Sequence, residues 1–218
     1  MAKLELIIAN KNYSSWSLRP WLVLKMGDIP FTERLIRFGE PRFGCEVRKV
    51  SAAGKVPILI HGKAVIWDSL AIAEYLAETF SERNLWPKSK SARAMARAVS
   101  SEMHSGFSNF RSACPMNLRR PPKPVKMSDA ADADVARIEE LWRDCRKAHG
   151  KGGRFLFGKF SIADAMFAPV VSRLETYAIP VAKDTRDYMN GITATKAFQS
   201  WKLEALKEPW IVPEDEVD

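Results

Sequence analysis

Apolar and polar residues follow two patterns in the first eighty residues, one typical of strands and one typical of helices. Short apolar or alternating runs predict strands at residues 4–10, 31–38, 56–60 and 63–67. Residues 16–26 and 68–80 carry apolar side chains at helical spacing instead. With a further short helix allowed in the irregular stretch 39–55, the order is β-α-β-(α)-β-β-α. This order predicts a compact α/β unit.

The pattern changes beyond residue 90, where no convincing strand follows. Helical spacing predicts long helices at residues 92–113, 129–149 and 162–178 and a shorter one at 193–206. The change from mixed to helical patterning indicates a boundary near residues 81–90. We therefore expect an α/β domain over residues 1–80 and an all-α domain over residues 88–218.

A proline interrupts one apolar, strand-forming run, where it cannot donate to a sheet ladder. A cis bond between Val56 and Pro57 would turn the chain there, just before an edge strand. The N–H and C=O of Val56 would then stay free to bind the backbone of a peptide-like ligand. An ordinary turn and strand is the alternative interpretation.

The helix that follows begins at Asp68 and Ser69. Its first N–H groups and its dipole form a site for an anion, unless the two residues do no more than cap the helix. Free backbone groups at Val56 beside a site for a carboxylate predict that the α/β domain binds a small acidic peptide.

Ser161, Ile162, Ala163 and Asp164 fit a capping box at the start of a nearly all-apolar helix. Such a helix is buried, and a buried carboxylate must be fully hydrogen-bonded. We expect Asp164 to have a structural role rather than a catalytic one.

The composition, with 46% hydrophobic and 28% charged residues, fits a soluble globular protein. No apolar run is long enough to cross a membrane, and the N-terminus lacks the apolar core of a signal peptide. Cys45, Cys114 and Cys145 are odd in number and widely spaced, which favours a reducing cytoplasm over a disulfide framework or a zinc site. No cluster of histidine and acidic residues has metal-ligand spacing, so we predict no metal.

The net charge of +8 raises the question of nucleic-acid binding. The basic residues are scattered, however, and their densest cluster, at residues 119–126, is rich in proline and typical of a loop. We expect attraction of anionic small molecules, and neither a specific nucleic-acid partner nor a membrane.

Together these features resemble the cytosolic glutathione transferases. The resemblance rests on V-P-x-L at 56–59, an acidic residue and a serine at 68–69, the helical second half and S-x-A-D at 161–164, and it covers nearly the whole chain. Residues 14–19, S-S-W-S-L-R, resemble the S-S-C-x-x-R signature of the zeta class, which includes maleylacetoacetate isomerase. Trp16 stands where that class has cysteine, so the chain is more similar to a bacterial branch of serine-type transferases.

The resemblance implies a thioredoxin-like N-terminal domain that binds glutathione. The glutathione thiol has a pKa of about 8.5, so an enzyme must stabilise its thiolate. A hydroxyl at the first strand–helix junction and the adjacent helix N-terminus can do this. Ser14 is the first candidate for that hydroxyl and Ser15 the second, and Tyr13 is an alternative to both. Ser17 is expected to cap the helix. Arg19 could raise the local potential or brace the fold.

Further contacts follow from the same resemblance. Val56 would pair with the cysteinyl unit, while Asp68 and Ser69 would bind the γ-glutamyl ammonium and carboxylate. The residues implied for glutathione are Lys55, Val56, Pro57, Asp68, Ser69, Arg42 and Glu102, with Lys55 and Arg42 directed at the glycyl carboxylate and Glu102 or His104 reaching across a homodimer. The co-substrate pocket would be formed by Trp16, Phe107, Phe110 and Arg111.

The expected activity is attack of the glutathione thiolate on an electrophilic, partly apolar small molecule. The resemblance implies a cytoplasmic homodimer that acts in detoxification, with glutathione as co-substrate and no metal. One alternative is a glutathione-dependent cis–trans isomerase of the maleylacetoacetate isomerase kind. The other is a non-catalytic binding module with the same fold.

Overall fold

The computed structural model describes residues 3–217 of the chain. Its first half contains β1 (Leu4–Ile8), α1 (Ser15–Met26), β2 (Thr32–Leu35), α2 (Phe43–Arg48), β3 (Ile58–His61), β4 (Ala64–Trp67) and α3 (Ser69–Thr79). The strands form one sheet in the order β2-β1-β3-β4, with β2 parallel to β1 and the other two pairs antiparallel. The predicted order of elements is confirmed, and this half has a thioredoxin-like fold.

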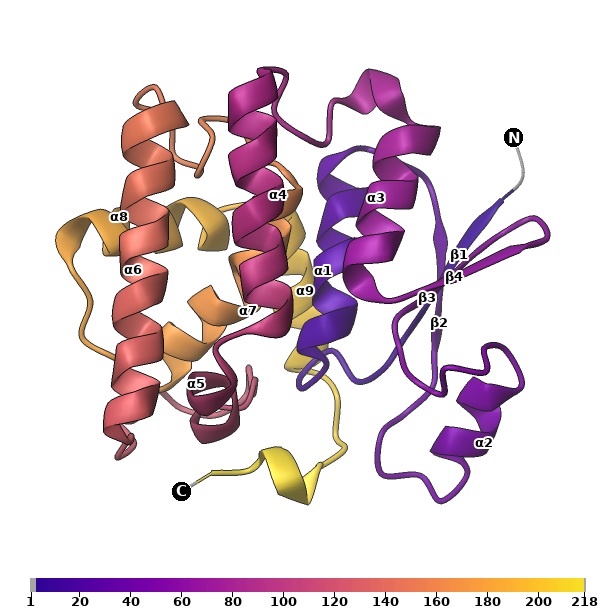
Figure 1. The fold of residues 1–218 in the computed structure, drawn as a ribbon. Helices are drawn as coiled ribbons and strands as arrows, with labels where there is room; N and C mark the ends of the chain where they lie inside the picture. The colour runs from indigo at the N-terminus through magenta and orange to yellow at the C-terminus, as the bar shows by residue number, and fades with distance from the viewer. Residues whose placement is uncertain (1–2, 218) are drawn as a thin grey trace.

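Helices cover both faces of the sheet. Leu6 and Leu59 contribute to the large core that also contains α1 and α3, while Ile7 and Ile58 pack with Val47 of α2. Adjacent side chains of a strand point to opposite faces, which explains this division. Figure 1 shows α1 and α3 between the sheet and the remaining helices, with α2 at the far side.

The second half is helical, as predicted. It contains α4 (Lys90–Ser105), α5 (Ser108–Ala113), α6 (Asp129–His149), α7 (Ile162–Thr176), α8 (Lys183–Thr193) and α9 (Lys196–Ala205), with single 3-10 turns η1 (Ser81–Arg83) and η2 (Pro213–Asp215). The capping box of α7 is confirmed: Ser161 and Asp164 bond each other's backbone N–H groups. Asp164 is fully buried and also accepts from Leu156 N at 3.0 Å.

Two helical predictions were wrong. The single helix predicted over residues 92–113 is two helices, because Gly106 is extended and Phe107 has a φ of 59°. Helix α8 was missed because polar residues dominate Lys183–Thr193 and few apolar side chains mark its buried face.

The end of the chain returns to the junction between the two halves (Figure 1). Glu208 accepts hydrogen bonds from the backbone N–H groups of Lys11 and Asn12. The Arg119 guanidinium donates to the carbonyl oxygens of Glu208 and Trp210. The C-terminal segment therefore borders the loop that precedes α1. Within residues 3–217, no helix combines the length and the apolar character needed to cross a lipid bilayer.

Candidate functional site

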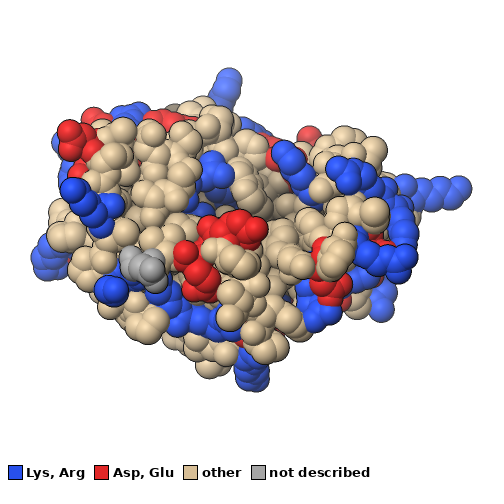
Figure 2. Space-filling view, turned by 90° about the horizontal axis from the view of Figure 1, so that it is seen from below, with Lys and Arg blue, Asp and Glu red and all other residues tan. Residues whose placement is uncertain are grey.

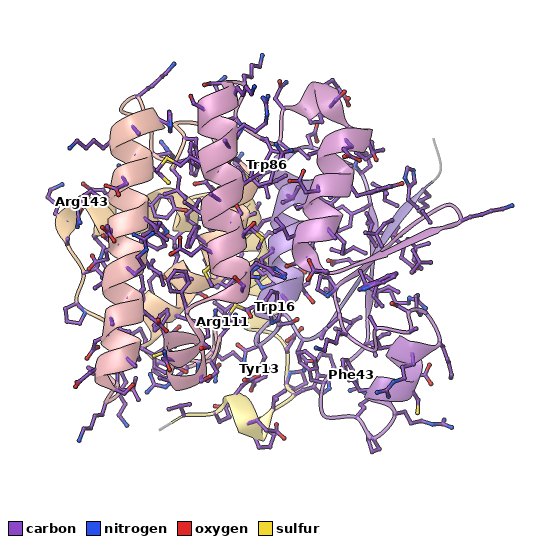
Figure 3. The ribbon with its side chains drawn as sticks, in the orientation of Figure 1. Tyr13, Trp16, Phe43, Trp86, Arg111 and Arg143 are labelled. Carbon is purple, nitrogen blue, oxygen red and sulfur yellow. The ribbon has the colours of Figure 1, made fainter. Side chains whose placement is uncertain are left out.

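A cavity of 450 Å³ lies where the start of α1 faces α5, α7 and the loop before β3. Seven residues singled out from the sequence line it: Tyr13, Ser14, Ser15, Trp16, Lys55, Val56 and Arg111. Figure 3 shows Tyr13, Trp16 and Arg111 near one another between α1 and α5, with Phe43 of α2 across from them. The cavity therefore draws residues from both halves of the chain.

Val56 is one of the residues that line this cavity. The Val56–Pro57 bond is cis, as predicted. Strand β3 begins only at Ile58, so Val56 lies outside the sheet ladder. No hydrogen bond within the described part of the chain uses the N–H or C=O of Val56. Both groups are therefore available to an extended peptide.

Asp68 and Ser69 form the N-terminus of α3. Asp68 is the N-cap, and its Oδ1 accepts from Leu70 N at 2.9 Å and Ala71 N at 3.2 Å. Ser69 is 1% exposed, and its Oγ has no hydrogen-bond partner among residues 3–217. A buried hydroxyl without a partner at a helix N-terminus suits a bound carboxylate.

The serines before α1 differ in their bonding. Ser14 Oγ donates to Ser17 Oγ at 2.7 Å, and Ser17 Oγ also accepts from Ala9 N at 3.2 Å. Ser17 therefore lies inside α1 and ties it to the end of β1, so its predicted role as helix cap was wrong. Ser15 Oγ accepts from Arg173 Nη2 at 3.3 Å and makes no bond to another serine.

Tyr13 also lines the cavity, but its hydroxyl is engaged elsewhere. It donates to a carboxylate oxygen of Glu216 and accepts from Arg119 Nη2 at 2.9 Å. Burial and the bond to Glu216 raise the pKa of Tyr13. Its hydroxyl therefore serves the C-terminal segment and does not point freely into the cavity.

Two arginines lie over the ring of Trp16: Arg19, which is buried, and Arg111, which is half-buried. The Cζ of Arg19 lies 4.0 Å from the centroid of the Trp16 ring, and that of Arg111 lies 4.6 Å from it. Burial lowers the pKa of Arg19 and of Arg111, and it lowers that of Arg173 to about 10. An arginine guanidinium does not lose its proton in proteins, so all three side chains carry a positive charge. A cavity bordered by so much positive charge favours anions.

Asp68, Ser69 and the remaining predicted residues are not part of the cavity lining. Arg42 is exposed at the start of α2, and Pro57 is buried. Glu102 forms an ion pair with Arg137 of α6, at 2.9 Å between Oε1 and Nε. Phe107 and Phe110 pack in the hydrophobic core, and Phe110 is fully buried.

Some cavity residues were missed from the sequence, above all Arg173 of α7 and Asp215 of η2. Arg173 could have been found, because it is the only basic residue in a helix that is otherwise nearly apolar. Asp215 carried no comparable signal. Figure 2 shows the face seen from below the view of Figure 1, with acidic side chains near its centre and lysines and arginines mostly toward its edges. The described residues contain no group of three or more histidine, cysteine or acidic residues that could hold a metal ion.

Residues 13–79 match the family model described as glutathione S-transferase, N-terminal domain. The chain is 31% identical over 188 residues to glutathione S-transferase 1 of Dianthus caryophyllus, covering 83% of this chain and 82% of that protein. It is 29% identical over 189 residues to maleylacetoacetate isomerase of Rattus norvegicus, covering 85% of each.

Solved structures show the same fold. A glutathione transferase homologue from Burkholderia GL BGR1, with bound glutathione, superposes with a TM-score of 0.72 at 22% identity, covering 93% of this chain and 98% of that one. A Tau class glutathione S-transferase from Mangifera indica superposes with a TM-score of 0.71 at 17% identity, covering 94% and 96%.

Proposed function

Since the chain belongs to the glutathione S-transferase family, we propose that it is a glutathione transferase that activates glutathione as a thiolate for attack on an electrophilic, partly apolar small molecule. The observation that carries this proposal is a cavity lined both by Val56, whose backbone N–H and C=O are unpaired, and by Ser15. The first can bind a peptide, and the second can donate to its sulfur.

Glutathione would lie along the loop before β3 and the start of α3. The cysteinyl backbone pairs with the N–H and C=O of Val56, next to Pro57. The γ-glutamyl carboxylate accepts from the free Ser69 hydroxyl and from the N-terminus of α3, and its ammonium contacts Asp68. Lys55 lines the cavity and binds the glycyl carboxylate, with Arg42 as the second candidate.

Ser15 is the proposed donor to the sulfur. The Ser14 hydroxyl already donates to Ser17, whereas Ser15 accepts from Arg173 and keeps its own proton for another acceptor. A hydroxyl donor and nearby cations stabilise the thiolate, so the thiol loses its proton to solvent more readily. The thiolate then forms a bond to the electrophilic carbon, and the leaving group departs with its electron pair.

The co-substrate would lie in the outer part of the same cavity, against Trp16 and Arg111. Phe107 and Phe110 support this region from within the core. Ser108, Ser112 and Met116 line it instead of the two phenylalanines. This arrangement assigns glutathione to a domain over residues 1–80 and the co-substrate mainly to a domain over residues 88–218.

The protein is proposed to work as a homodimer in the cytoplasm, in detoxification. Val65 and Trp67 of the edge strand β4 are 38% and 54% exposed, which gives a second copy an apolar surface to cover. Glu102, half-buried on α4, is the candidate for a contact with glutathione in the partner subunit. Cys45, Cys114 and Cys145 are free thiols, which suits a reducing compartment.

A glutathione-dependent cis–trans isomerase is the second candidate. It is favoured by the similarity to the rat maleylacetoacetate isomerase over 85% of the chain. In that reaction the thiolate adds to the double bond and leaves again after rotation, so glutathione is not consumed. Trp16 disfavours this candidate, because the zeta-class signature has cysteine at that position. A binding module without turnover is the third candidate.

Purified protein should be tested with glutathione and chlorodinitrobenzene. We expect thioether formation, and Ser15→Ala should lower kcat/KM about 100-fold while the Kd for glutathione changes little. Ser14→Ala is the matched control and should have a smaller effect. Full activity of Ser15→Ala would exclude the proposed role. Glutathione binding without any turnover supports the binding module, and a changed double bond with no loss of glutathione supports the isomerase.

A further inference from the structure

We infer that Arg173 is a positioning residue for thiolate formation: its guanidinium holds the Ser15 hydroxyl so that its proton points into the cavity. The inference rests on the proposed function. It adds a residue of the helical half to chemistry that otherwise uses the first half of the chain.

The Arg173 side chain is held in place from two sides. It is 4% exposed within α7. Its Nε donates to the carbonyl oxygen of Cys114 at 2.7 Å, and its Nη2 donates to Ser15 Oγ at 3.3 Å. The planar guanidinium is therefore oriented by the segment after α5 while it contacts the first residue of α1.

The direction of the hydrogen bond between Arg173 and Ser15 follows from which of the two groups can donate and which can accept. A guanidinium has donors and no acceptor, so Ser15 Oγ must accept from Arg173. A hydroxyl has one proton, and the Ser15 proton finds no acceptor in the described part of the chain. Ser15 and Arg173 both line the cavity. A sulfur placed there is the acceptor that this proton lacks.

One donor group of Arg173 is also unpaired. Its Nη1 is buried and has no hydrogen-bond partner among residues 3–217. Burial of an unpaired cation is costly, and a nearby anion offsets that cost. A thiolate beside Ser15 is such an anion.

Five charged or titratable groups lie near Arg173. Arg111 of α5 and Arg19 of α1 add positive charge. Asp215 of η2 opposes them, while Cys114 and Tyr177 are neutral near pH 7 because burial raises the pKa of each, to about 11 and about 12. The cations outnumber the single carboxylate, so the field favours the thiolate over the thiol.

The test is a pH titration of the ultraviolet thiolate absorbance of glutathione bound to the full-length protein. In the wild type the thiol pKa should lie well below about 8.5. Arg173→Gln should raise it by about one unit. Arg173→Lys should recover part of the shift, because it keeps the charge and loses the planar fork.

Two further variants test whether Arg173 positions the Ser15 hydroxyl or only anchors the segment after α5. Tyr177→Phe removes the bond from the Tyr177 hydroxyl to the Pro115 carbonyl at 2.9 Å, which anchors the same segment without touching Ser15, and the thiol pKa should not change. If Arg173 acts through Ser15, the double variant Ser15→Ala/Arg173→Gln should shift the thiol pKa by less than the sum of the two single shifts.

The outcomes distinguish the inference from the proposed function. If bound glutathione has the same thiol pKa in Arg173→Gln and Arg173→Lys as in the wild type, the inference is overturned. The proposed function is not affected by that result. Additive shifts in the double variant also overturn it, because Arg173 would then act on the sulfur independently of Ser15. Failure of the wild type to bind glutathione overturns both.

Discussion

Asp68 Oδ2 lies 3.1 Å from His104 Nε2, and this contact joins the N-cap of α3 to the last turn of α4. The other oxygen of the same carboxylate accepts from Leu70 N and Ala71 N. The His104 ring also packs edge-on against Trp16, with 5.2 Å between ring centroids. Asp68 thus caps one helix and links both halves of the chain beside the proposed glutathione site.

Replacement of Asp68 separates its two roles. Asp68→Asn keeps a good N-cap and tolerates the φ of 75°, so stability should change little. Loss of its charge should still weaken glutathione binding about tenfold, because the γ-glutamyl ammonium loses an ionic partner. Asp68→Ala should weaken binding and also lose about 1 kcal/mol of stability. Calorimetric titration and urea unfolding measure the two quantities. Equal glutathione affinity in wild type and Asp68→Asn would remove Asp68 from the site.

His104 predicts a pH dependence of stability. Burial lowers the pKa of His104, more strongly than Asp68 raises it. The unfolded chain then binds a proton at His104, with a pKa of about 6.5, more readily than the folded chain does. This contribution to stability is fully present above about pH 6.5 and is lost as pH falls through the lower folded pKa.

His104→Gln removes that titration and should lose less stability than the wild type between about pH 7 and about pH 5. Urea unfolding at both pH values gives the comparison. The same loss in both proteins would show that His104 is not linked to folding in this way.

The order of elements in the first half could be predicted because the periodicity of its apolar residues distinguished strands from helices. The break at Gly106 and Phe107 could not, because apolar spacing continues across it into α5. Sequence spacing placed Ser14 and Ser15 at the junction before α1 but could not distinguish them. Their difference depends on Ser17 and Arg173, and Arg173 lies 158 residues from Ser15 along the chain.

Lys11 should contribute to stability far more than an exposed lysine does. It is 6% exposed, its Nζ lies 2.8 Å from Glu33 Oε1 and contacts Glu204, and it lies over the rings of Trp21 and Trp201. Lys11→Met should cost about 2 kcal/mol in the free energy of unfolding, because both carboxylates lose their partner.

The control for this change is Lys49→Met, since Lys49 pairs with Glu46 on the open surface. Its unfolding midpoint should match that of the wild type. Thermal or urea unfolding gives both values. A loss in Lys49→Met as large as that in Lys11→Met would contradict the assignment of Lys11 to a partly buried network.

Asp164 should matter for folding and not for chemistry. It accepts from Leu156 N, Ser161 N and Ser161 Oγ at 3.0, 2.8 and 3.0 Å. Asp164→Ala leaves these donors without a partner and should cost about 3 kcal/mol. The kcat per folded molecule, measured at low temperature, should stay near the wild-type value. A large fall in kcat with unchanged stability would point to a catalytic role instead.

The most direct measurement is a crystal structure of the protein with bound glutathione. The cysteinyl backbone should pair with the N–H and C=O of Val56, and the sulfur should lie about 3.3 Å from Ser15 Oγ. A sulfur bound to Ser14 or Tyr13, or a tripeptide that leaves the Val56 backbone unpaired, would contradict the account.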